Sequence, residues 1–298
     1  MQRIGSLLFL TFICFCSFAA DLPVPEELIG KQTIGIVQIN TKDLNYDQLV
    51  KSAEKAGPLP DNPLDMIKQT LEKFKEAGGL GISVLVHADK KTDPNNIHEG
   101  IVLVIKKTAE ADVAKIEALL NEGEAPIKNV AATECPKKVG DSLVWYNAKF
   151  KLPAADAERA KEFKETYAEM GKDSSLSLVI VPDEDSKALV QSAIQDAKPD
   201  VAIVKPLLSA SSLCISTNLG IATEPSLKIL IVSEDADGAG KLKTAAAAML
   251  GELKKDAPPP AQPFLESLKV IQKDANVQLS IELSELSKVL KAMLEPPK

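Results

Sequence analysis

The sequence predicts an α+β protein made of two related repeats, each a mainly antiparallel sheet of about four strands with helices on one face. Three observations predict this fold. Paired strand-like apolar runs occur at 79–107 and again at 211–234, and a helix-like segment follows each pair. The matching elements lie about 126 to 132 residues apart. Each half also has the order strand, helix, strand, strand, helix, strand, which is typical of split βαβ or ferredoxin-like folds.

An apolar N-terminal stretch predicts a secretory signal peptide over residues 1–19. Residues 4–18 are almost uninterrupted apolar sequence, and small residues precede a cleavage site after Ala19. The run is shorter than the roughly 20 residues that span a bilayer. A lipid anchor is the alternative, but neither Cys14 nor Cys16 follows small residues. We therefore expect a secreted or periplasmic protein with no transmembrane segment after signal cleavage.

Apolar periodicity and breaker residues place the elements of the first repeat, residues 20–151. Strand-like runs lie at 33–40, 80–88, 101–107 and 142–150, and helical spacing occurs at 63–77 and 110–120. Pro63 opens the first helix, Gly78 ends it, and Thr108 is expected to cap the second helix. Trp145 lies in a strand pattern, so we expect it in the core rather than in a binding site.

A connecting helix is predicted over 152–172, because Ala160, Phe163 and Tyr167 form one apolar stripe in an otherwise charged segment. The second repeat then covers 173–298. Its strands are expected at 176–181, 211–219, 226–234 and 277–283, and its helices at 183–197, 237–255, 263–271 and 285–294.

The two repeats differ in the polarity of their sheet faces. The last strand alternates apolar and polar side chains, so the second sheet is expected to have one solvated face. The first repeat is expected to have a more apolar face, which the other repeat, the connecting helix or a ligand must cover. The side chains assigned to this face are Val37, Ile39, Leu85, Val102, Val104 and Tyr146.

Composition excludes some classes of partner. The chain has a net charge of −7, only 4% aromatic residues and no basic stripe. Nucleic-acid binding therefore lacks the clustered positive charge that it needs. We expect the partner to be an unknown protein or small-molecule ligand.

Cysteine is scarce in the mature chain, which keeps only Cys135 and Cys214. One bridge between the repeats and two separate thiols are both open, with Cys214 favoured as a small buried residue in a strand. A catalytic thiol needs a base nearby, and the chain has only two histidines.

Two segments were candidates for metal binding. His87 and His98 bracket a loop that also holds Asp93 and Glu99, but their spacing matches no recognised metal motif. Residues 233–238 resemble half of a calcium loop, yet the acids needed at its first and twelfth positions are absent, and a helix N-cap fits better. The sequence therefore assigns no catalytic, cofactor-binding or metal residue, and we expect no cofactor.

The signal peptide, the strand pairs at 79–107 and 211–234, and the alanine-rich helix at 237–255 together form a recognisable layout. This layout resembles that of uncharacterised secreted α+β proteins of planctomycete-type bacteria, and the resemblance covers most of the chain. It implies an exported or cell-envelope setting and no known activity, so no functional residue is carried over.

We expect a secreted, non-enzymatic binding or structural module of the cell envelope, because the repeated scaffold comes without a catalytic constellation. One alternative is a hydrolase with a pair of carboxylates in the cleft between the repeats. The other is a carrier of an apolar ligand on the apolar face of the first repeat.

Overall fold

The computed structural model describes residues 22–48, 61–88, 100–121, 137–147, 150–170, 174–185, 187–188, 209–218, 226–256 and 262–282. The strands in this part of the chain are β1 (Thr33–Asn40), β2 (Gly79–His87), β3 (Ile101–Lys107), β4 (Lys137–Val139), β5 (Ser142–Tyr146), β6 (Leu176–Ile180), β7 (Ser212–Thr217), β8 (Ser226–Val232), β9 (Lys269–Lys273) and β10 (Asn276–Glu282). The helices are α3 (Asp61–Glu76), α4 (Val113–Asn121), α6 (Ala157–Met170), α8 (Ala236–Asp256), α9 (Gln262–Ser267) and the short 3-10 turn η1 (Glu26–Leu28).

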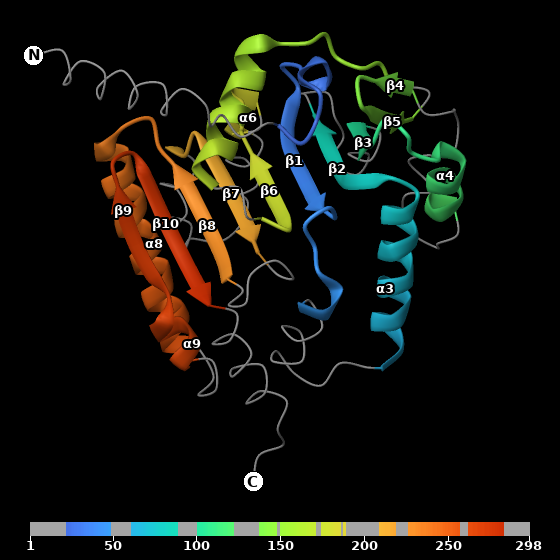
Figure 1. Ribbon diagram of the computed structural model, residues 1–298. Helices are drawn as coiled ribbons and strands as arrows, with labels where there is room; N and C mark the ends of the chain where they lie inside the picture. Colours follow the sequence, from blue (N-terminus) through green and yellow to red (C-terminus); the bar gives the residue numbers. More distant parts are fainter. Residues whose placement is uncertain are drawn as a thin grey trace, which may run out of the picture.

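All ten strands belong to one antiparallel sheet in the order β4-β5-β3-β2-β1-β6-β7-β8-β10-β9 (Figure 1). The α+β class and the antiparallel pairing are therefore confirmed. The split βαβ order is wrong, because β1, β2 and β3 lie side by side in chain order, as do β6, β7 and β8. Apolar spacing shows that strands exist, but it does not determine which strands pair.

The two halves of the sheet meet where β1 pairs with β6. The Asn40 N–H donates to the Ser175 carbonyl at 2.8 Å, and the Val181 N–H donates to the Ile34 carbonyl at 3.0 Å. The two hydrogen bonds close opposite ends of the same strand pair. The halves are thus joined edge to edge by main-chain bonds, which leaves both faces of the sheet to be covered by other elements.

Counted outward from the junction of β1 and β6, the two halves have equivalent strand orders, β1-β2-β3-β5-β4 in the first and β6-β7-β8-β10-β9 in the second. Local details of the turns match as well. The turn between β4 and β5 has a positive φ at Gly140 (58°), and the turn between β9 and β10 has one at Asp274 (51°). Hydrogen bonds next to these turns also match. Lys107 N–H donates to the Asp141 carbonyl at 3.1 Å in one half, and Ser233 N–H donates to the Ala275 carbonyl at 2.9 Å in the other.

Helix α6 lies across one face of the sheet, here called the α6 face (Figure 1). Its apolar stripe is buried as predicted, with Phe163 fully enclosed. The N-terminal segment Leu22–Ile29 covers the first half of the same face, and together they form a single apolar core. Ile36, Leu85, Val102 and Val104 lie in this core without solvent exposure.

Two of the six side chains assigned to this apolar face belong to the other side. Ile36 pairs with Leu85, whereas Val37 pairs with Val84, so Val37 and Ile39 point away from α6. A register irregularity between Thr33 and Gly35 at the start of β1 shows that strand pairing here does not follow simple alternation. The register between strands decides which residues share a face, and a single strand pattern does not show it.

The opposite face is covered at its two ends by different helices. Helices α3 and α4 pack on the first half around Phe74, Ile116 and Trp145, so the core position of Trp145 is confirmed. Helix α8 packs on the second half around Ala239 and Leu242. No helix in the described part of the chain is long and apolar enough to cross a membrane.

Some predicted boundaries were wrong. Helix α4 begins after Asp112, whose carboxylate accepts the Lys115 N–H at 3.1 Å, so Thr108 is not its cap. The edge strands β4 and β9 were missed, and residues 269–271 were assigned to a helix. Both edge strands are short and lysine-rich, as is common where one side of a strand is left unpaired. The predicted helix at 285–294 lies outside the described residues, as does most of the one at 183–197.

Candidate functional site

The histidine candidate contains only one residue that the structure describes, because His98, Asp93 and Glu99 lie outside the described residues. His87 is buried at the end of β2, where its Nδ1 lies 3.1 Å from the Thr33 hydroxyl and its ring lies 5.4 Å from that of Phe150. Burial lowers the pKa of His87 to about 4. Within the described residues, no three His, Cys, Asp or Glu side chains come together to hold a metal ion.

The half calcium loop is a helix cap, as the sequence favoured. The Asp235 carboxylate accepts the Gly238 N–H at 2.6 Å at the start of α8. This geometry is that of an N-cap side chain, which satisfies a main-chain donor that the helix leaves free.

Cys214 lies buried in β7 as a free thiol, and Cys135 lies outside the described residues. Burial raises the pKa of Cys214 to about 12, so the sulfur stays protonated near neutral pH. The thiol points toward the Thr166 carbonyl at 3.8 Å. Cys214 therefore behaves as a small core residue rather than as a nucleophile.

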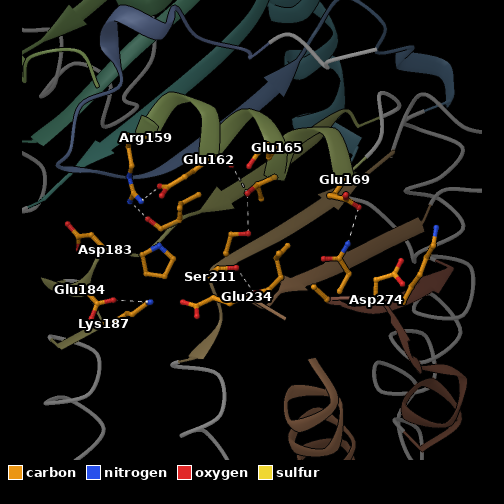
Figure 2. A pocket seen from close by; sticks show the side chains of 18 residues that line it. Arg159, Glu162, Glu165, Glu169, Asp183, Glu184, Lys187, Ser211, Glu234 and Asp274 are labelled. Atoms are coloured by element: carbon orange, nitrogen blue, oxygen red, sulfur yellow. Dashed lines mark hydrogen bonds and ion pairs between the residues drawn. The ribbon is translucent and has the colours of Figure 1, made fainter. Parts of the chain in front are cut away.

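An acid-lined pocket lies on the α6 face of the second half, and Figure 2 shows it closely. We call it the acidic pocket. Its volume is about 870 Å³, within the range of ligand pockets in proteins. It is bounded by α6, by the chain that follows β6, by β8 and by the turn between β9 and β10. The lining residues are Arg159, Glu162, Glu165, Thr166, Glu169, Val181, Pro182, Asp183, Glu184, Lys187, Ser211, Ser212, Val232, Glu234, Lys273, Asp274, Ala275 and Asn276.

The floor of the acidic pocket is made of small hydroxyl side chains. The hydroxyl of Thr166 lies 3.1 Å from that of Ser212, and it also donates to the Glu162 carbonyl at 2.8 Å. Ser211 donates to the Val232 carbonyl at 3.0 Å. Thr166 and Ser212 are buried, so the floor is fixed by its own hydrogen bonds before any ligand arrives.

Arg159 closes the pocket where the two halves of the sheet meet. Its guanidinium donates to the Thr33 carbonyl at 2.8 and 3.0 Å and to the Val181 carbonyl, and it forms an ion pair with Glu162 at 2.7 Å. The Asp156 carboxylate accepts the Arg159 N–H at 2.9 Å and caps α6. Arg159 is buried and its donors are engaged, so it anchors α6 to the junction of β1 and β6.

The rim of the acidic pocket carries most of its charge. Seven acidic and three basic side chains line the pocket, which gives a net charge of −4. Glu169 accepts from the Asn276 amide at 3.0 Å, and Glu184 pairs with Lys187 at 3.2 Å. Glu234 and Asp274 are exposed, and their carboxylates form no hydrogen bond or ion pair with the described residues. A concave surface with excess charge of one sign concentrates ligands of the opposite sign.

Sequence reasoning missed these residues, although one signal was present. Glu162, Glu165 and Glu169 follow one another at intervals of three and four, so they share one side of α6. That stripe lies beside the apolar stripe that packs on the sheet. The pattern was interpreted as an ordinary charged face, since the sequence does not show that a second wall of β8 and β9 stands opposite.

The ionisable side chains of the acidic pocket are carboxylates, two lysines and one arginine. Neither histidine nor cysteine is among the residues that line the pocket in the described part of the chain. Comparison with protein-family models, with curated proteins and with solved structures finds no match for this chain.

Proposed function

We propose that this chain is an exported, non-enzymatic binding module, built from two duplicated α+β halves, that takes a cationic ligand in the acidic pocket. The net charge of −4 around a pocket of about 870 Å³ is the observation that carries the proposal. The signal-like residues 1–19 support export to the periplasm or the cell exterior. The hydroxyl floor supports binding, because its polar groups offer hydrogen bonds at the bottom of a charged rim.

Duplication is supported by the symmetry of the hydrogen bonds rather than by strand order alone. The bond from Asn40 to Ser175 joins the end of β1 to the start of β6, and the bond from Val181 to Ile34 joins the end of β6 to the start of β1, so the two bonds match under exchange of the halves. A matched positive φ at Gly140 and Asp274 extends the relation to both edges of the sheet. Repeated units of this kind fix an architecture and leave function to the places where the copies differ.

Calorimetric titration of the mature chain with spermidine at low ionic strength tests the proposal. Low salt is needed because surface charges are screened over about 10 Å at 0.1 M salt. We expect binding that weakens as salt rises, and roughly tenfold weaker binding in the double variant Glu234→Gln/Asp274→Asn, since each exposed charge contributes about 0.2–1 kcal/mol.

The matched control removes two exposed carboxylates from α3, on the other face of the sheet. The double variant Glu72→Gln/Glu76→Gln has the same change in net charge and should bind spermidine like the parent chain. If both double variants lose the same affinity for spermidine, the loss comes from the net charge of the chain and not from a site in the acidic pocket. An absence of binding in the parent chain would contradict the proposal outright.

A hydrolase remains the second candidate, because the same pocket brings several carboxylates together on α6 and the β9–β10 turn. Substrate turnover by the purified mature chain, lost in Glu234→Gln/Asp274→Asn, would replace binding as the function. The apolar-carrier alternative loses its support, since the chain's own N-terminal segment and α6 bury Leu85, Val102 and Val104 completely.

A further inference from the structure

The N-terminal segment occupies a groove on the first half of the α6 face. Leu22 and Val24 are buried there, and the Ser83 hydroxyl lies 3.5 Å from the Pro23 carbonyl. A small recess of about 230 Å³ remains beside the segment. It is lined by residues 22–26, by Lys164 of α6, and by Lys106, Gly140, Asp141 and Ser142 at the edge of the sheet.

Strand register places this groove at the position that the acidic pocket has in the second half. Leu103 pairs with Trp145 as Ile229 pairs with Leu279, which aligns β3 and β5 with β8 and β10. Four lining positions of the recess then match four of the acidic pocket: Lys106 with Val232, Gly140 with Asp274, Asp141 with Ala275, and Ser142 with Asn276. Residues 22–26 of the chain itself border the first site, with bends at Pro23 and Val24 and the start of η1 at Glu26. Among the described residues none fills the second site.

Helix α6 separates the two sites and presents a different charge to each. Lys164 faces the N-terminal segment and lies 3.5 Å from the Glu26 carboxylate. Glu162, Glu165 and Glu169 face the acidic pocket. The same helix therefore offers a lysine to a segment that carries glutamate on one side, and a row of carboxylates to an open site on the other.

We propose that the acidic pocket receives a polypeptide segment with lysine or arginine side chains, at the place that residues 22–26 border in the first half. This inference rests on the proposed function and names the class of its ligand. The Ser211 hydroxyl, which already donates to the Val232 carbonyl, accepts an N–H of the peptide backbone, and the cations of the peptide meet the carboxylates of the rim. An extended five-residue segment spans at most about 18 Å.

Three probes of matched size or charge test the inference on the mature chain at low salt. The first is the capped pentapeptide Lys-Pro-Lys-Pro-Lys, which has the length and the proline positions of residues 22–26. The second is Glu-Pro-Glu-Pro-Glu. The third is spermidine, which has the same three positive charges as the first peptide but no peptide backbone.

We expect the lysine peptide to bind at least tenfold more tightly than spermidine, and the glutamate peptide not to bind. Binding of the lysine peptide should weaken about tenfold in Glu234→Gln/Asp274→Asn and stay unchanged in Glu72→Gln/Glu76→Gln. If spermidine shows this pattern and the lysine peptide binds no more tightly, the peptide inference fails while cation binding stands. If neither probe binds, both proposals fail.

Discussion

The two halves of the sheet share their strand order and their turns but differ in what covers the α6 face. In the first half, Leu85 and Val102 lie under the N-terminal segment with no exposed surface. Strand register gives Ser216 and Lys228 the same positions in the second half, where Lys228 is exposed. The first half thus contributes a closed apolar surface at positions where the second half is polar, and the acidic pocket opens on the same face of the second half. The difference shows that two halves with the same strand order can place different chemistry at equivalent positions.

The largest expected effect comes from truncating the closed core. Leu85→Ala should lower the free energy of unfolding by about 2–5 kcal/mol, because it removes buried methyl groups and leaves a cavity. Lys228 holds the position in the second half that is equivalent to Val102, the strand partner of Leu85. Lys228→Ala should change the free energy of unfolding by less than about 0.5 kcal/mol. Urea unfolding of both variants measures the difference. Similar losses would show that the two halves do not differ in packing.

Acid should weaken the first half through His87. Its folded-state pKa of about 4 lies below the ordinary 6.5, so the unfolded chain binds the proton more readily. The contribution of neutral His87 to the free energy of unfolding is fully present above pH 6.5 and is lost as pH falls toward 4. It amounts to about 3 kcal/mol. Asn218 holds the equivalent position in the second half and does not titrate.

The measurement for this prediction is the pH dependence of stability in the parent chain and in His87→Phe. The variant should lose the part of the slope that lies between pH 6.5 and 4, whatever its stability at pH 7. An unchanged slope would show that His87 is not the source of acid sensitivity.

A smaller loss is expected where the halves join. Arg159→Met removes the donors to the buried carbonyls of Thr33 and Val181 and should destabilise the chain by about 1–3 kcal/mol. Lys161→Met is the matched control on α6, since Lys161 is exposed and should contribute less than about 1 kcal/mol. Thermal unfolding followed by circular dichroism compares the two. A loss no larger than that of the control would mean that Arg159 does not hold α6 to the junction.

Much of the fold was predictable because local patterns report it directly. The apolar spacing of Ala160, Phe163 and Tyr167 correctly predicted both the connecting helix and its buried side. Strands with several consecutive β-branched or aromatic residues were placed within a few residues of their observed ends. Edge strands such as β4 were not, since short lysine-rich segments lack an apolar signal of their own.

The candidate site was not predictable for a different reason. Its residues come from α6, from the chain after β6, and from the β9–β10 turn, and only the tertiary packing brings these together. The same holds for the N-terminal segment, because Leu22 and Val24 alternate with prolines, which do not fit inside a sheet strand or a helix. Strand register, which the sequence does not encode locally, also decided that Val37 and Leu85 face opposite sides.

Mapping of amide chemical shifts in a chain of residues 20–298 during a spermidine titration tests the comparison most directly. We expect shifts to move for Glu234, Ala275 and Asn276 in the acidic pocket. Asp141 and Ser142 beside the N-terminal segment, which are the counterparts of Ala275 and Asn276 in the first half, should stay unchanged. Equal shift changes in both halves would contradict the claim that the second half is the open one. So would shift changes that occur only at residues outside the acidic pocket.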